Sequence, residues 1–134
     1  MYSADFIRLW HKLSKDMKQH LEDELAPLTE GQLQVLELLL GAENRMKPSD
    51  LVEILETTPA AVTTLLDRME KGSLIQRERD EKDRRLVWIT VTDKGKSECD
   101  RGIDVRKRYV EAHLGNISSH NQQLLVYLLG KVAN

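Results

Sequence analysis

The sequence is poor in residues that cross-link a protein or tether it to a membrane. Cys99 is the one cysteine among 134 residues, so an internal disulfide and a cysteine-based zinc site are both excluded. No apolar run approaches the roughly 18 residues that a membrane span needs, and residues 1–5 do not open a signal peptide. We therefore expect a cytoplasmic protein that has no membrane partner.

Motifs for catalysis and for metal binding are missing as well. The sequence shows no glycine-rich phosphate loop and no Ser-His-Asp, Cys-His or carboxylate–histidine arrangement, so we expect neither an enzyme nor a cofactor. No two of the histidines stand at an i, i+4 spacing, which speaks against a metal site. Hydrophobic residues make up 40% and charged residues 31%, and this composition and length predict one globular domain over residues 1–134.

Charge is distributed unevenly along the chain. The formal net charge is −2, which by itself disfavours a polyanionic partner. However, residues 68–96 hold nine Lys and Arg against six Asp and Glu, whereas residues 31–67 hold two against six. A local basic segment of this kind binds a polyanion whatever the total charge, although a solvated charged surface has the same composition.

Apolar residues three and four positions apart predict a long amphipathic helix over residues 3–26. Thr29 and Gln32 form a capping-box pattern that begins a second helix, and Gly41 can end it. The apolar positions that support the first helix and its exit are Phe6, Trp10, Leu13, Met17, Leu21, Leu25 and Leu28.

Two shorter helices follow. Pro48 suits the first turn of a brief helix, residues 56–58 form a turn, and Thr58 with Pro59 begins the next helix. That helix has an apolar face with Val62, Leu65, Leu66 and Met69 and an opposite face with Thr63, Thr64, Asp67 and Arg68. Two helices joined in this way are typical of a helix-turn-helix, whose second helix enters the major groove of DNA; a generic pair of packed helices would look similar.

A charged hairpin comes next. Residues 74–79 and 86–91 have the alternation of strands around a loop at 80–84, the arrangement of the wing in a winged helix. We expect Arg84 and Arg85 to reach DNA beside the major groove, and Asp83 to brace the loop by pairing with Arg77 or Arg79. Alternatively, the charges only discourage pairing with strands of other molecules.

The two ends of the chain predict a dimer. A charged helix over residues 93–116, weakened by Gly102, precedes a last helix that Ser118 or Ser119 caps. The last helix carries too much apolar surface for a monomer to expose, so we expect it to pack with the first helix against a second copy; a large intramolecular core is the alternative. The dimerisation residues are Phe6, Trp10, Leu13, Leu124, Leu125, Leu128, Leu129 and Val132.

The order of these elements, with Asp67-Arg68, Asp83-Arg84-Arg85 and Thr92-Asp93-Lys94-Gly95, resembles the MarR (multiple antibiotic resistance regulator) family of bacterial transcription factors. The resemblance implies a mainly α fold with a small β-hairpin. It also implies a winged helix-turn-helix lobe over residues 28–95, and dimerisation helices over 1–27 and 96–134. The expected function is a homodimeric repressor that binds a pseudo-palindromic operator and is released by a small molecule or an oxidant. The alternative is a winged-helix protein-interaction module without specific DNA binding.

The resemblance also directs the choice of site residues. The expected DNA-binding set is Thr58, Pro59, Ala60, Ala61, Thr63, Thr64, Arg68, Arg84 and Arg85. The family's usual ligand pocket would be lined by Trp10, Met17, His20 and Leu21; alternatively, these residues belong to the core or to the interface. Thr64 stands where many members have an arginine, and Ser73 stands where a glycine is usual. Cys99 has carboxylates on both sides, which disfavour a reactive thiolate, so we interpret it as structural.

Overall fold

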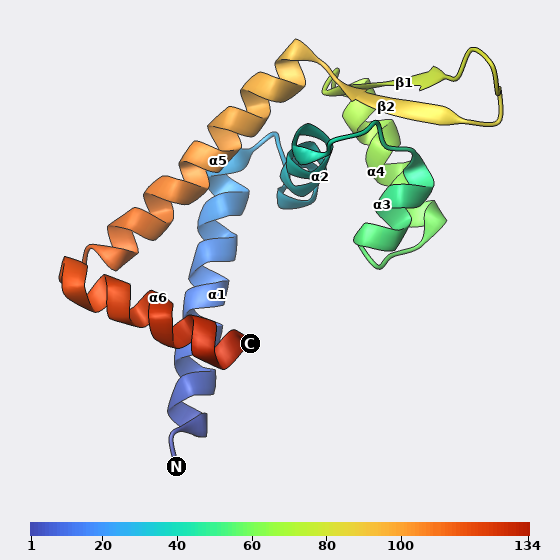
Figure 1. Cartoon of the computed structure of the whole chain (residues 1–134). Coiled ribbons are helices and arrows are strands. Elements are labelled where there is room, and N and C mark those ends of the chain that lie inside the picture. Colours follow the sequence, from blue (N-terminus) through green and yellow to red (C-terminus); the bar gives the residue numbers. More distant parts are fainter.

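The computed structural model describes all residues, 1–134, and shows six helices and one two-stranded hairpin (Figure 1). The mainly α fold with a small β-hairpin that the sequence predicts is therefore confirmed. The elements are α1 (Ser3–Leu25), α2 (Glu30–Gly41), α3 (Pro48–Ile54), α4 (Pro59–Lys71), β1 (Ile75–Arg79), β2 (Val87–Val91), α5 (Asp93–Leu114) and α6 (Ser119–Ala133). None of the six helices combines the length and apolar character that crossing a membrane requires.

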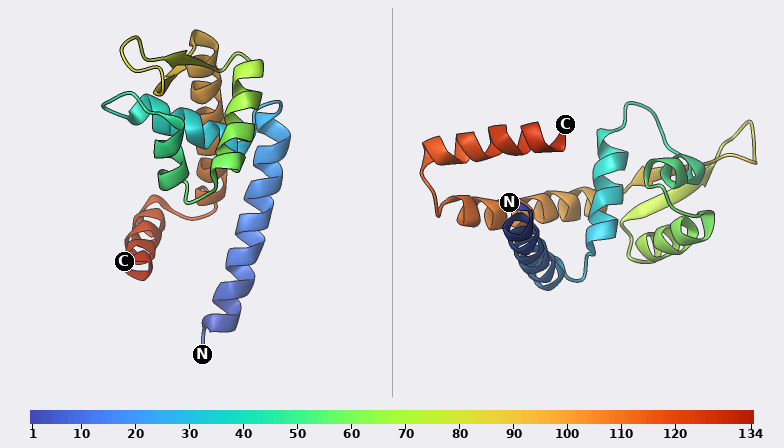
Figure 2. Two further views of the ribbon diagram at one scale, coloured as in Figure 1. Left: turned by 90° about the vertical axis from the view of Figure 1, so that its right-hand side faces the viewer. Right: turned by 90° about the horizontal axis from the view of Figure 1, so that it is seen from below.

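The molecule has two regions. Helices α2, α3 and α4 and the hairpin gather at one end, while α1, α5 and α6 extend away from them (Figures 1 and 2). The corner between α5 and α6 lies far from the hairpin, and α6 runs back from it toward α1 (Figures 1 and 2). Helix α5 leads directly from β2 into the extended region, so it connects the hairpin with the terminal helices.

Side-chain caps determine where several helices begin. The Thr29 hydroxyl accepts from the Gln32 backbone N–H, and the Gln32 side chain accepts from the Thr29 N–H, which confirms the capping box. The Thr58 hydroxyl accepts from the Ala61 N–H at the start of α4, and Ser118 rather than Ser119 caps α6 by accepting from the Asn121 N–H. Because these oxygens satisfy N–H groups that a helix leaves unpaired, they stabilise the local boundaries that the sequence indicates.

One core of fifteen buried apolar residues runs from the crossing of α5 with α1 and α2 into the lobe of α3, α4 and the hairpin. Leu21, Leu25, Leu33 and Leu36 are buried at the crossing. A Cβ at Gly102 of α5 would lie only 2.8 Å from Cδ1 of Leu33, so Gly102 permits the close approach of the helices. Most of α5 is exposed to solvent, but the interpretation of Gly102 as a weak point is wrong, because this glycine is buried where α5 contacts α2.

Arg101 of α5 also closes the end of α1. Its guanidinium donates to the carbonyl oxygens of Glu24 at 3.1 Å and of Leu25 at 2.6 Å, two groups in the last turn of the helix. The Glu98 carboxylate holds this guanidinium at 2.8 Å, and the bond keeps the pKa of Glu98 below its usual value. The extended region is therefore fastened to the base of α5 by polar contacts as well as by apolar ones.

The hairpin has a defined register, with Arg77 opposite Ile89 and Glu78 opposite Trp88. Ile89 is buried, and its backbone N–H donates to the Met46 carbonyl at 2.9 Å, which attaches the strand to the loop before α3. The strands end at Arg79 and resume at Val87, so the loop is two residues longer than residues 80–84.

The first half of α1 and the whole of α6 leave their apolar side chains exposed. Helix α6 buries none of its residues, and Trp10 and Val132 expose 54% and 70% of their surface. The alternative of a large intramolecular core under these helices is therefore wrong. The exposed apolar residues include Phe6, Ile7, Leu9, Trp10, Leu13, Leu124, Leu125, Val126, Leu128, Leu129 and Val132.

Candidate nucleic-acid interface

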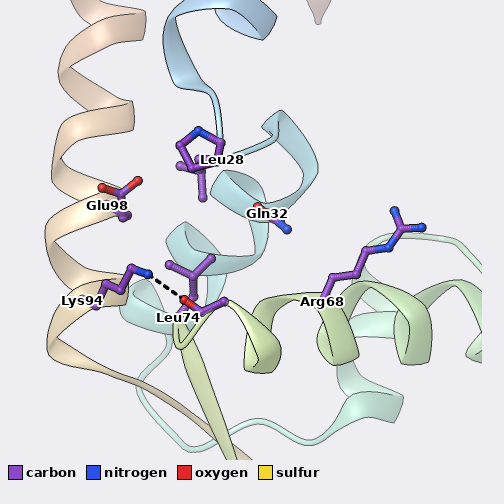
Figure 3. Close-up of a pocket in the computed structure, with 8 residues that line it drawn as sticks. Leu28, Gln32, Arg68, Leu74, Lys94 and Glu98 are labelled. Carbon is purple, nitrogen blue, oxygen red and sulfur yellow. Dashed lines mark hydrogen bonds between the residues drawn. The ribbon is translucent and has the colours of Figure 1, made fainter.

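Helix α4 presents a polar face to solvent. Val62, Leu66 and Met69 are buried, whereas Thr58, Pro59, Ala60, Ala61, Thr63, Thr64 and Arg68 are exposed. Arg68 lies at the margin of a hollow of about 280 Å³, and its guanidinium points away from Glu98 and Lys94 on the other side (Figure 3). Every predicted residue of this helix is thus free to meet a partner.

Helix α4 ends in an unusual conformation. Gly72 is the C-cap, and Ser73 follows with φ = 62°, the left-handed conformation that glycine adopts without strain. Ser73 therefore occupies the conformation for which the family's usual glycine is suited. The Lys94 ammonium donates to the Gly72 carbonyl at 2.9 Å and compensates one free group at this helix end (Figure 3).

Arg77 fastens the first strand to α4. Its guanidinium donates to Asp67 at 2.6 Å and to Glu70 at 3.0 Å, and the bond from Arg77 holds the pKa of Glu70 below its ordinary value. The side chain of Arg77 therefore leans toward the helix and away from the hairpin tip. The predicted pairing of Asp83 with Arg77 or Arg79 is wrong.

Asp83 is bound to its own neighbour instead. One carboxylate oxygen accepts from the backbone N–H of Arg85 at 3.1 Å and from its Nε at 3.0 Å, and the other accepts from Nη2 at 3.1 Å. This bond lowers the pKa of Asp83. Arg79 donates to the carbonyl oxygen of Arg84 at 2.8 Å, so the loop bends back on itself and leaves both Arg84 and Arg85 exposed.

Sequence reasoning missed Asp80, which organises the loop. One of its oxygens accepts from the backbone N–H of Lys82 at 3.0 Å and of Asp83 at 2.9 Å. The other accepts from Nε1 of Trp88 at 3.0 Å, and these bonds, led by that of Trp88, lower the pKa of Asp80. An Asp that directly follows a strand favours such a turn, because its side chain can accept from the backbone N–H two residues further on.

Comparison with known proteins agrees with this geometry. The sequence profile of the MarR family matches residues 28–87. The transcriptional repressor MdtR of Bacillus subtilis is 29% identical over 125 residues, which are 93% of this chain and 79% of that protein. The crystal structure of YusO from Bacillus subtilis has a TM-score of 0.82 at 27% identity and covers 98% of this chain and 91% of its own.

The family match over residues 28–87 and these relatives support a MarR-family winged-helix transcriptional regulator. In this fold α3 and α4 are the helix-turn-helix, and β1 and β2 are the wing. A mutant MarR of E. coli complexed with operator DNA has the same fold, with a TM-score of 0.72 and 25% identity over 95% of this chain and 92% of that one.

The predicted ligand pocket is only partly assembled. Met17 and Leu21 line a hollow of about 340 Å³ with residues of α2 and with Arg106 of α5, which is paired with Glu37 at 2.8 Å. Trp10 and His20 do not line it. His20 instead lies against the ring of Tyr109 with 4.7 Å between the ring centroids, because the helical repeat places it beside α5.

Cys99 is buried in the core. Burial, followed by the charges of Glu37 and Asp100, raises the pKa of its thiol. A thiol that is both inaccessible and hard to ionise is a poor nucleophile, so the structure favours the structural interpretation of this cysteine.

Proposed function

We propose that this MarR-family regulator is a repressor that binds a pseudo-palindromic operator as a homodimer and is released by a small molecule. The observation that carries the proposal is the exposed polar face of α4, held at Thr58 by its cap and at Arg77 by the wing. A helix presented in this way fits the major groove, and the exposed Arg84 and Arg85 follow it in the wing. One half-site is expected for each protomer.

The uncovered apolar surface of α1 and α6 supports the dimer. Leucine, valine and aromatic side chains on these two helices are exposed together, with Trp10 at 54% and Val132 at 70%. Contiguous apolar surface of this extent is rare on monomers. A twofold dimer would present two α4 helices to half-sites about one helical turn, roughly 34 Å, apart, which agrees with a pseudo-palindromic operator.

The ligand would bind in the hollow beside Met17 and Leu21. The Arg106–Glu37 pair at its wall joins α5 to α2, so an anionic ligand that competes with Glu37 for Arg106 would alter the connection between the terminal helices and the DNA-binding lobe. Arg106→Gln should therefore bind operator but respond less to an anionic inducer. An identical inducer response of Arg106→Gln and wild type contradicts this assignment.

The test of DNA binding uses an inverted repeat from the DNA upstream of the gene, titrated with purified protein at several salt concentrations. The expected result is a shift of that fragment with steep salt dependence, since phosphate contacts release counterions. A protein that binds no DNA, or binds with no salt dependence, would favour a winged helix used only for protein contacts.

The wing variants refine this test. Arg85→Ala should lose roughly tenfold in affinity, most on operators with A·T-rich flanks, where a narrow minor groove attracts arginine. Arg84→Ala should weaken all sequences alike and reduce the salt slope by about one phosphate contact. Asp83→Ala removes a negative charge, so electrostatics alone predicts tighter binding, whereas loss of the bonds that Asp83 accepts from Arg85 would loosen the loop and predicts weaker binding. Tighter binding at low salt would show that Asp83 merely belongs to a solvated charge run.

A further inference from the structure

A contact at the base of the wing joins three parts of the chain. Trp88 of β2 donates from Nε1 to the Asp80 carboxylate at 3.0 Å. On its ring face lies Arg45, from the loop before α3, with Cζ 4.6 Å from the ring centroid. The indole thus connects the wing tip, the second strand and the α2–α3 loop, and neither Trp88 nor Arg45 belongs to the expected DNA-binding residues.

Asp80 transmits the position of Trp88 to the wing tip. The oxygen that Trp88 leaves free accepts from the N–H groups of Lys82 and Asp83, at 3.0 and 2.9 Å. The Asp80 backbone N–H also donates to the Leu86 carbonyl at 2.9 Å, which closes the loop. The tip residues that precede Arg84 are therefore bonded to a carboxylate that the indole holds.

Arg77 and Met46 attach the two strands of the wing to the rest of the lobe, but the wing tip lies beyond both contacts. An isolated two-stranded hairpin is marginally stable, and the loop of residues 80–86 lies beyond the last ladder residues Arg79 and Val87. On the other side of β2, the backbone of Met46 already pairs with Ile89. Arg45 directly precedes Met46 in the same loop, and its contact with Trp88 extends this attachment of the α2–α3 loop toward the wing tip.

We propose that Trp88 is a positioning residue, which through Asp80 and Arg45 sets the direction of the wing relative to α4 before DNA binds. The inference rests on the proposed DNA-binding function. It assigns to Trp88 no contact with DNA. Its role is to hold Arg84 and Arg85 where they reach the flank of the half-site, so that less ordering of the wing is needed on binding.

The matched variants are Trp88→Phe, which keeps an aromatic ring in the strand but removes the N–H donor, and Asp80→Asn, which removes the charge and part of the acceptor capacity. The control is Glu78→Gln. Glu78 is exposed on the same face of the hairpin, opposite Trp88, and makes no side-chain hydrogen bond or ion pair. Asp80→Asn and Glu78→Gln remove the same negative charge, so electrostatics alone predicts the same slightly tighter binding from both.

The measurement is the ratio of affinities for two operators that differ only in their flanks, A·T-rich or G·C-rich. We expect Trp88→Phe and Asp80→Asn to lower this ratio several-fold toward one while the footprint of α4 in the major groove is unchanged, and Glu78→Gln to keep the wild-type ratio. Equal weakening on both operators, or an unchanged ratio in Trp88→Phe and Asp80→Asn, overturns the proposal. Operator binding by the wild-type protein is measured before any variant is compared. A wild-type protein that shifts no operator overturns the proposed function itself.

A second measurement needs no DNA. The indole N–H resonance of Trp88 should shift in Asp80→Ala and stay in place in Glu78→Gln, with circular dichroism confirming the fold. Arg45→Ala provides a variant at an exposed loop position, where loss of the fold is not expected. It should lower the flank ratio in the same direction, to a smaller extent. A wild-type ratio in Arg45→Ala shows that the loop takes no part in directing the wing and overturns its place in the proposal.

Discussion

Replacing Arg77 with alanine should destabilise the protein by about 1–2 kcal/mol at neutral pH. Charge-assisted hydrogen bonds to two carboxylates are lost, of which the shortest are to Asp67 at 2.6 Å and to Glu70 at 3.0 Å. Bonds to charged groups contribute about 1.5–3 kcal/mol when buried. Here Asp67 and Glu70 expose 56% and 42% of their side chains, so solvent screening reduces each bond to about 0.5–1 kcal/mol.

The pH dependence separates these bonds from simple packing. The folded-state pKa of Glu70 lies below its ordinary value of 4.5, chiefly because of the hydrogen bond from Arg77. A depressed carboxyl pKa stabilises the folded state above the unfolded-state pKa, and this stabilisation is lost as the pH falls through the folded-state pKa. The difference between wild type and Arg77→Ala should therefore be complete above about pH 5 and should shrink toward about pH 3.

Urea unfolding followed by circular dichroism at one protein concentration, at pH 7 and near pH 3, measures this difference. Arg77→Lys is the matched variant, because an ammonium keeps the charge but lacks the fork that reaches two carboxylates, and it should lose an intermediate amount. If Arg77→Ala loses the same free energy of unfolding at both pH values, the loss comes from packing of the aliphatic stem, and the assignment to the carboxylates is refuted.

Three further predictions concern the ends and the middle of the chain. Removing residues 118–134 should abolish dimer and operator binding, as measured by light scattering and gel shift; a truncated chain that stays folded and binds with full affinity contradicts this. Thr63→Ala and Thr64→Ala should each weaken operator binding by about 1 kcal/mol, the value of a neutral hydrogen bond, and footprints confined to the minor groove would refute that placement. Ser73→Gly should raise the free energy of unfolding by up to about 1 kcal/mol, since it relieves a left-handed serine at some cost in chain entropy; a lower thermal midpoint would count against it.

Much of the fold could be predicted because its signals are local. The spacing of Val62, Leu66 and Met69 identified the buried face of α4, and the Thr29–Gln32 pattern located the start of α2. Caps and apolar spacing act within one or two turns of helix, so they can be predicted from residues close together in the sequence. The role of Gly102 could not be predicted in this way. Its effect depends on Leu33, on a different helix, and intrinsic propensity alone made it a weak point of α5.

The side-chain partners in the wing loop could not be predicted from the local sequence. Six adjacent charged residues make the loop recognisable, but their partners follow from side-chain directions that only the folded turn defines. Alternation along β1 carries Arg77 toward α4, out of reach of Asp83, and carries Asp80 to the face where Trp88 lies. The acidic residue that organises this loop is consequently the one to which an indole N–H donates from eight positions away in sequence. Charge alone does not distinguish Asp80 from Asp83, and the indole of Trp88, which the sequence presents as one more strand residue, makes the difference.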